Sequence, residues 1–235
     1  MAVSKAKQAA VIGAGLIGRS WAMVFARAGW RVKLFDPDKA QRKSAPKLIA
    51  AALRDQAKHR LVRGPAAIAR RIGIAATLEE AAAGADLIQE CGPEVLSIKQ
   101  DLFARLDAAA KPAALIASST SSIAASHYTE GLKGRARCLV AHPVNPPHLV
   151  PVVELCGAPW TSKPVMAKAR KLYASLGQVP ILVKKEIEGF ILNRLQGAVL
   201  AEAFRLAGEG YVSPQDLDHT IKHGLGLRWS FMGAV

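Results

Sequence analysis

Short apolar runs alternate with longer amphipathic segments along residues 8–183 of the chain. The short runs predict buried strands, because each is bounded by turn residues and is too short for a helix. We expect strands at 8–12, 30–35, 72–76, 86–90, 113–117, 138–141, 152–156 and 179–183. Helical stretches lie between most of them, and this alternation predicts a mostly parallel sheet covered by helices on both faces.

Two of the helical stretches have clear signals in the sequence. The apolar stretch 16–28 ends before Gly29, which is a natural helix stop. Residues 37–63 place apolar side chains every four residues on one face and basic side chains on another, so we expect an amphipathic helix that is basic outward. Pro46 predicts a break or a first-turn position within it.

The pattern changes after about Glu186. Residues 189–207 predict a long helix, and Ser213-Pro214 predicts the start of another, with serine as the N-cap and proline at the first helical position. We therefore expect an α/β domain over residues 1–184 and an all-α domain over residues 185–235. The boundary would lie near Lys184.

Composition and charge narrow the class of protein. The chain has 235 residues, of which 51% are hydrophobic and 21% charged, as expected of a soluble globular protein. No apolar run is long enough for a membrane span, and no secretory signal is evident. Cys91, Cys138 and Cys156 are widely spaced, which favours free thiols and a cytoplasmic location. The net charge of +14 suggests an anionic ligand, nucleic acid or an acidic surface as partner.

A glycine motif follows the first expected strand and opens the first expected helix. It reads Gly13-Ala14-Gly15-Leu16-Ile17-Gly18 and matches GxGxxG, which predicts a dinucleotide site with the pyrophosphate at the helix N-terminus. Asp36 closes the second strand 18 residues after Gly18, and its carboxylate would accept ribose hydroxyls and repel a 2′-phosphate. The motif therefore predicts a Rossmann-type, doubly wound fold with NAD as cofactor. The alternative is an ordinary strand–helix turn with a solvated Asp36.

A histidine and a glutamate suggest acid–base chemistry. His142 ends an expected strand, where open α/β sheets bind ligands, and Glu154 stands among apolar residues of the next strand. A carboxylate in that setting is costly unless it is paired, and His142 is its natural partner. The pair is a general-base arrangement. The alternative is a histidine that caps a strand end beside a glutamate at a sheet edge.

Two further polar features could complete a site. The hydroxyl run 118–122 follows an apolar strand, and one of its members could contact substrate or cofactor; we expect Ser122 to be a helix N-cap. Asn193 shares a helix face with Phe190, Gly197 and Phe204, so we expect it to point inward. Its partner would be a substrate oxygen or an internal hydrogen bond.

These segments resemble the 3-hydroxyacyl-CoA dehydrogenase family in the family's order. The matching pieces, over residues 8–233, are GAGLIG, LIQECGPE with Lys99 after it, SSTSS, HPVNPP, Glu154 and EGFILNRLQ. The resemblance implies that His142 is the base, that Glu154 is its partner, and that Ser121 and Asn193 hold the substrate oxygen. It also implies that Glu94, Lys99 and Asn145 lie near the nicotinamide end or the catalytic loop.

Within that family, the chain is most similar to the lambda-crystallin and L-gulonate 3-dehydrogenase branch. Acyl-CoA members typically have two aromatic residues where Pro143 and Val144 follow the histidine here, and they contact CoA through a serine and a lysine where this chain has Ala52 and His59. These departures favour an L-gulonate-like 3-hydroxy acid as substrate. The basic stretch 39–71 favours a CoA thioester instead, unless it is a solvated helix face.

The resemblance also implies a longer helical second domain, so we expect the C-terminal domain to be partial and the protein to be a homodimer. Two other functions stay open: a catalytically weak, crystallin-like NAD-binding protein, and non-specific nucleic-acid binding, for which no module is recognisable. His219 and His223 have the spacing of metal ligands on a helix but no acidic or cysteine partner nearby, so we expect no metal site.

Overall fold

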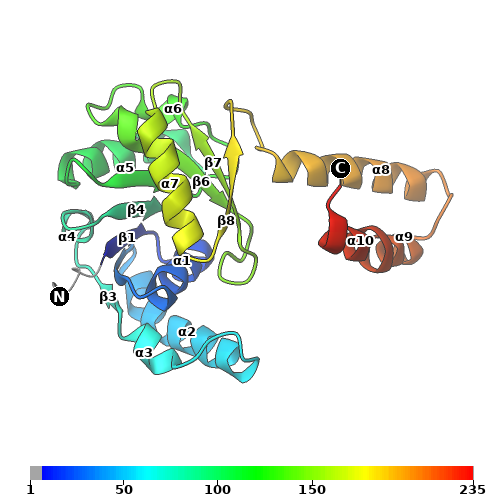
Figure 1. Ribbon diagram of the computed structural model, residues 1–235, viewed down its shortest axis with the longest axis horizontal. Helices are drawn as coiled ribbons and strands as arrows, with labels where there is room; N and C mark the ends of the chain where they lie inside the picture. The colour runs from blue at the N-terminus through cyan, green and yellow to red at the C-terminus, as the bar shows by residue number, and fades with distance from the viewer. Residues whose placement is uncertain (1–6, 235) are drawn as a thin grey trace. The chain divides into compact units, whose positions relative to one another are not determined.

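The protein is described by a computed structural model over residues 7–234. It divides into two compact units, one reaching to Phe190 and one starting at Ile191 (Figure 1). Residues 184–190, which follow the last strand, are grouped with the first unit.

The first unit is built around one eight-stranded sheet within the described residues. Every expected strand is present, with bounds shifted by at most a few residues. The strands are β1 (Gln8–Ile12), β2 (Arg31–Phe35), β3 (Ile72–Ile74), β4 (Leu87–Glu90), β5 (Leu115–Ser118), β6 (Cys138–Pro143), β7 (Val152–Gly157) and β8 (Val179–Val183).

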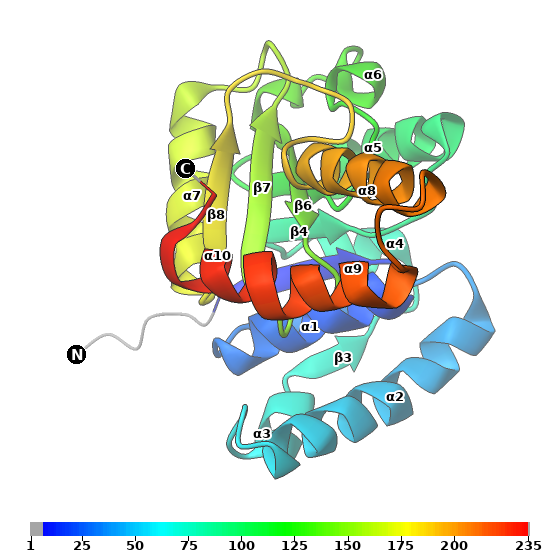
Figure 2. The same ribbon diagram turned by 90° about the vertical axis from the view of Figure 1, so that its right-hand side faces the viewer.

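The strand order is β3-β2-β1-β4-β5-β6-β7-β8. All neighbouring pairs are parallel except β6 and β7, which are antiparallel. Figure 2 shows β7 beside β8 at the end of the sheet. The order reverses between β1 and β4, and the crevice at such a reversal is where doubly wound sheets bind ligands.

Helices cover both faces of the sheet. In β1, Ala9 and Val11 belong to one buried cluster and Ala10 and Ile12 to the other, because successive side chains of a strand point to opposite faces. Helices α1 (Leu16–Arg27), α2 (Lys39–Lys58), α3 (Pro65–Ala69) and α7 (Lys163–Ser175) pack on the first face, and α4 (Leu78–Ala82), α5 (Leu96–Ala109) and α6 (Ser126–Thr129) on the second. A short 3-10 turn, η1 (Arg135–Arg137), precedes β6.

Pro46 corrects one expectation, because it lies inside α2 without ending it. Its position is exposed, so the backbone carbonyl one turn earlier, which loses a hydrogen-bond donor, can be solvated. Ala45, Ile49 and Leu53 are buried on both sides of the proline, and their packing holds the helix together. The helix ends at Lys58, short of the expected residue 63.

The second unit contains α8 (Leu192–Gly208), α9 (Pro214–Thr220), a π-helical turn η2 (Ile221–Leu225) and α10 (Gly226–Met232). Ser213 caps α9 as expected, accepting a hydrogen bond from the Asp216 backbone N–H at 3.1 Å. Helix α8 starts later than expected, because Gly189 and Phe190 both have positive φ angles, which a right-handed helix does not allow.

No helix among residues 7–234 is both long enough and apolar enough to cross a membrane. The three cysteines are free, and Cys138 and Cys156 are buried.

Candidate active site

The glycine motif forms a tight turn between β1 and α1. Gly13 has a φ of +109°, and its N–H donates to the Phe35 carbonyl at 2.7 Å. A Cβ added to Gly18 would lie 1.8 Å from the carbonyl oxygen of Gly13. The strand end and the helix start therefore approach more closely than any other residue type would permit.

The start of α1 is open toward a ligand. Gly15 is the N-cap and supplies no side-chain cap, and a Cβ built on it meets nothing within 4 Å. Leu16 and Ile17 form the first turn, where backbone N–H groups point out of the helix. This uncapped N-terminus fits a dinucleotide pyrophosphate.

Asp36 joins the end of β2 to the glycine motif. One of its carboxylate oxygens accepts the Ala14 N–H at 2.7 Å, and the other accepts the Asp38 N–H at 2.9 Å. Each oxygen keeps a second lone pair for a further donor. The half-buried carboxylate thus lies beside the glycine turn, where a ribose would follow the pyrophosphate.

The carboxylate of Glu90 holds the ends of β4 and β5 together. It accepts hydrogen bonds from the Gly92 N–H at 2.6 Å and the Ser118 hydroxyl at 2.5 Å, and both of its oxygens lie within 3.1 Å of Lys99 Nζ. Glu90 and Lys99 are at most 1% exposed. Lys99, expected near the nicotinamide end, therefore lies beneath the site and contacts Glu90.

Glu94 fixes the loop that carries Ser121. Its carboxylate accepts the Ser121 N–H at 2.7 Å and the Thr120 hydroxyl at 2.8 Å. Thr120 Oγ1 in turn accepts the N–H groups of Ser122 and Ile123. The expectation that Ser122 is a helix N-cap is wrong, because Thr120 Oγ1 closes a loop turn here and α6 begins only at Ser126, with Ala125 as an N-cap that has no side-chain hydrogen bond.

His142 and Glu154 face each other across the antiparallel pair β6–β7. His142 Nδ1 lies 2.8 Å from Glu154 Oε2, and the two side chains are 7% and 2% exposed. An ionised carboxylate can only accept a hydrogen bond, so Nδ1 carries a proton, and in the neutral ring the other nitrogen, Nε2, is the basic one. The strand register thus produces the base arrangement directly.

Phe190 packs against the His142 ring, with centroids 5.4 Å apart. It is fully buried, and its φ of +46° is unusual for a bulky residue. From the sequence, Phe190 was expected only to share a helix face with Asn193. The preceding Gly189 is the signal that could have placed it in a turn before the helix.

A cavity of about 310 Å³ is lined by five of the expected site residues. Ile17 lines it from the glycine motif, His142 from β6, and Glu94 and Ser121 from the two joined loops. Its complete lining is Ile17, Cys91, Gly92, Glu94, Ser119, Ser121, His142, Pro143 and Asn145. The glycine motif and His142 therefore line the same cavity, which lies at the end of the strands where the strand order reverses.

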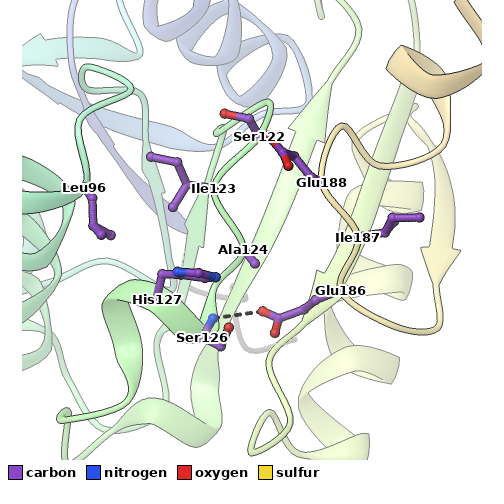
Figure 3. Close-up of a pocket in the computed structure, with 9 residues that line it drawn as sticks. All are labelled: Leu96, Ser122, Ile123, Ala124, Ser126, His127, Glu186, Ile187 and Glu188. Atoms are coloured by element: carbon purple, nitrogen blue, oxygen red, sulfur yellow. Dashed lines mark hydrogen bonds between the residues drawn. The ribbon is translucent and has the colours of Figure 1, made fainter. Parts of the chain in front are cut away.

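A second cavity of about 470 Å³ flanks the same loops (Figure 3). Its lining comes from residues that follow those of the first cavity in the same loops, such as Ser122 and Leu96, and from the turn that leads to Phe190. It contains two carboxylates, Glu186 and Glu188, and Glu186 accepts the Ser126 N–H at 2.8 Å.

Asn193 lies at the start of α8, in the second unit. Its side chain is exposed in this chain and not inward as expected. Among the described residues, no group of three or more His, Cys, Asp or Glu could hold a metal ion. His219 and His223 stack on one another with centroids 5.6 Å apart.

Comparisons with known proteins identify the family of the chain. Residues 8–187 match the 3-hydroxyacyl-CoA dehydrogenase NAD binding domain, and residues 189–235 match the C-terminal domain of the same family. The chain is 40% identical to the lambda-crystallin homolog of Homo sapiens over 238 residues, covering all of this chain and 75% of that protein. It is 39% identical to the L-carnitine dehydrogenase of Pseudomonas putida, covering 98% of this chain and 71% of that enzyme.

Among solved structures, the (S)-3-hydroxybutyryl-CoA dehydrogenase of Ralstonia eutropha superposes with a TM-score of 0.86 at 27% identity. The match covers 94% of this chain and 78% of that one. The glycine turn, the open helix start and the buried His142–Glu154 pair are thus found in a chain whose two parts both match one family. The protein belongs to the 3-hydroxyacyl-CoA dehydrogenase family and is an NAD-dependent oxidoreductase.

Proposed function

We propose that this protein oxidises the 3-hydroxyl of a free L-3-hydroxy carboxylic acid of the L-gulonate kind to the 3-keto acid. The observation that carries the proposal is the buried hydrogen bond between His142 Nδ1 and Glu154 Oε2, at 2.8 Å, beside the cavity that the glycine motif also lines. Oxidation of an alcohol needs a base for the hydroxyl proton next to the cofactor that takes the hydride.

In this mechanism, His142 Nε2 takes the proton of the substrate hydroxyl. Bound NAD⁺ supplies the hydride acceptor for the carbinol carbon. Glu154 holds the ring in the tautomer with Nε2 unprotonated and stabilises the imidazolium after proton uptake. Phe190, which is fully buried, packs against the His142 ring and would limit its movement.

Ser121 and Asn193 are the groups we assign to the substrate oxygen. Ser121 supports this role because its loop is fixed by Glu94 and lines the same cavity as His142. Asn193 would come from the second domain, and the resemblance alone carries its role. Together they would hold the alcohol oxygen so that its proton points at Nε2.

The cofactor would bind where the strand order of the sheet reverses, between β1 and β4. Gly13, Gly15, Leu16, Ile17 and Gly18 would receive the pyrophosphate, as the open start of α1 supports. Asp36 would accept the adenosine ribose hydroxyls.

The loops that line the 310 Å³ cavity would hold the nicotinamide end of the cofactor. Glu94 and Asn145 would lie beside the ring. Lys99 would support the nicotinamide end indirectly, by holding Glu90 in place, because it is buried against that carboxylate and does not line the cavity.

Charge and the relatives support a free acid as the substrate class. The second cavity carries Glu186 and Glu188, which disfavours the phosphates of CoA near it. Pro143 and Val144 follow His142 in place of paired aromatic residues. The L-carnitine dehydrogenases among the relatives are named for a free 3-hydroxy acid, not a thioester.

A second candidate is an L-3-hydroxyacyl-CoA, such as 3-hydroxybutyryl-CoA. The observation in its favour is the basic outer face of α2, where Lys47, Arg54 and Lys58 are exposed. A solved structure with this activity in its name also superposes well.

We further propose a cytoplasmic homodimer. Large apolar side chains are exposed on the second unit, including Leu195 at 60%, Phe204 at 73% and Phe231 at 82%. Surfaces of this kind usually meet a partner. Light scattering behind a sizing column would measure the mass, and a monomer would contradict the dimer.

The experiment offers L-gulonate, L-carnitine and L-3-hydroxybutyryl-CoA separately to the purified chain with NAD⁺ and follows the absorbance of the NADH that forms. The proposal expects turnover of a free acid and little of the thioester. Turnover of the thioester alone would contradict the proposal in favour of the second candidate. NADH binding without turnover of any of the three would favour a catalytically weak, crystallin-like protein.

A further inference from the structure

The hydroxyl of Ser119 lies between two N–H donors at the wall of the 310 Å³ cavity. The indole N–H of Trp21 donates to Ser119 Oγ at 3.1 Å, and the side-chain amide Nε2 of Gln89 donates to the same oxygen at 2.7 Å. Trp21 and Gln89 are fully buried. The two donors come from α1 and β4, beneath the cavity.

The direction of the Gln89 hydrogen bond is fixed by its other neighbours. The Tyr173 hydroxyl donates to Gln89 Oε1, and the Ala141 carbonyl lies 3.4 Å from Gln89 Nε2. A flipped amide would set its oxygen against the Ala141 carbonyl. Gln89 therefore presents N–H, and not C=O, to Ser119.

These donors decide what Ser119 can offer. A serine hydroxyl has two acceptor lone pairs and one O–H donor, and the indole and amide N–H groups occupy both lone pairs. The O–H must then be donated to a third group. Within the described residues, the structure puts Cys91 Sγ at 3.2 Å from Ser119 Oγ, and both residues line the cavity.

Cys91 is a weak partner that a bound ligand can replace. Thiols accept hydrogen bonds poorly, and burial raises the pKa of the Cys91 thiol to about 12, so it stays neutral at physiological pH. An oxygen acceptor entering the cavity would take the Ser119 proton in its place.

We propose that Ser119 positions the cofactor by donating its O–H to the carbonyl oxygen of the nicotinamide carboxamide. The inference rests on the proposed function, which puts the nicotinamide in this cavity between Ile17 and His142. The carboxamide carries one acceptor and one donor group, and Ser119 can serve only the acceptor. The hydrogen bond would set the ring orientation and hence the face that meets the substrate.

The test compares three dinucleotides by titration calorimetry on the full chain. NAD⁺ and its 3-acetylpyridine analogue both keep the carbonyl oxygen, whereas thionicotinamide adenine dinucleotide carries a sulfur, which is a weak acceptor. The wild-type chain should bind the first two about three- to tenfold more tightly than the third, as one neutral hydrogen bond predicts. Ser119→Ala should bind all three with equal affinity.

Two further variants complete the design. Ser175→Ala, which removes an exposed hydroxyl bonded to the Leu172 carbonyl on α7, should keep the wild-type ratio. Trp21→Phe removes one of the two donors, so the Ser119 proton can turn away from the ligand. The affinity ratio of this variant should therefore lie between that of the wild-type chain and that of Ser119→Ala. This variant tests the inference if Ser119→Ala does not fold.

An unchanged affinity ratio in Ser119→Ala or in Trp21→Phe would overturn the role of Ser119 and leave the proposed function standing. A wild-type chain that binds none of the three dinucleotides would overturn both. A wild-type ratio of one would also overturn the inference, because it would mean that the carbonyl oxygen meets no donor.

Discussion

Lys99 Nζ lies 3.0 and 3.1 Å from the two carboxylate oxygens of Glu90, in a place where neither side chain is more than 1% exposed. The same carboxylate receives the Gly92 N–H and the Ser118 hydroxyl. Because Gly92 lines the cavity and Ser118 precedes Ser119, this buried ion pair ties the floor of the site to the sheet.

Lys99→Met should destabilise the chain by about 3–5 kcal/mol, because it leaves a buried, unpaired carboxylate. Urea unfolding measures the loss. The double variant Lys99→Met with Glu90→Gln should recover part of it, since no charge is then buried. Lys47→Met on exposed α2 is the control, with an expected change within about 0.5 kcal/mol. An equal effect of Lys99→Met and Lys47→Met would contradict the ion pair's role.

Asp36→Asn should weaken NAD⁺ binding about tenfold or more and reduce the preference for NAD⁺ over NADP⁺. The reason is the loss of a charged acceptor beside the ribose. Asp38→Asn is a matched control, because Asp38 caps α2 through the Ala40 N–H and asparagine caps equally well. Affinities for both cofactors, measured by fluorescence titration, check the prediction. Equal affinities in the two variants would argue against a ribose contact by Asp36.

The two glycines at the start of α1 should respond differently to alanine. In Gly18→Ala the Cβ meets the backbone of Gly13, so the variant should lose about 1–3 kcal/mol of stability as well as NAD⁺ binding. In Gly15→Ala the Cβ meets nothing in the chain, so stability should hold while NAD⁺ binding falls. Thermal unfolding and cofactor titration separate the two effects. Normal NAD⁺ binding by Gly15→Ala would contradict the proposal that the pyrophosphate binds at this helix end.

Much of the first unit could be predicted from the sequence, because its strands are apolar runs with clear bounds. The His142–Glu154 contact was predicted from the cost of a lone carboxylate in an apolar strand. Its cause, an antiparallel register that sets the two residues opposite one another, has no local signal. The burial of Lys99 was missed for a similar reason, since its partner Glu90 lies on β4 and only the packing of α5 brings them together.

Thiol reactivity should depend strongly on pH. Burial raises the pKa of Cys91, Cys138 and Cys156 to about 12 each, against about 8.5 for a free cysteine. A raised pKa keeps the thiols protonated at pH 8, so native alkylation by iodoacetamide should be about a thousandfold slower than for a free thiol and should rise about tenfold per pH unit up to pH 10. The same shifts lower stability as pH rises above about 8.5 toward 12. Mass spectrometry of labelled native and denatured protein checks this, and rapid native labelling at pH 8 would refute it.

The measurement that tests the central claim most directly is the comparison of His142→Gln with the wild-type chain, on the substrate that it turns over, for both kcat and NADH affinity. If His142 is the base that Glu154 holds in place, kcat falls by about 10²–10⁴ while the NADH dissociation constant stays within about twofold. A fall in kcat of less than about tenfold, or a joint loss of turnover and NADH binding, would contradict the account and give His142 a structural role.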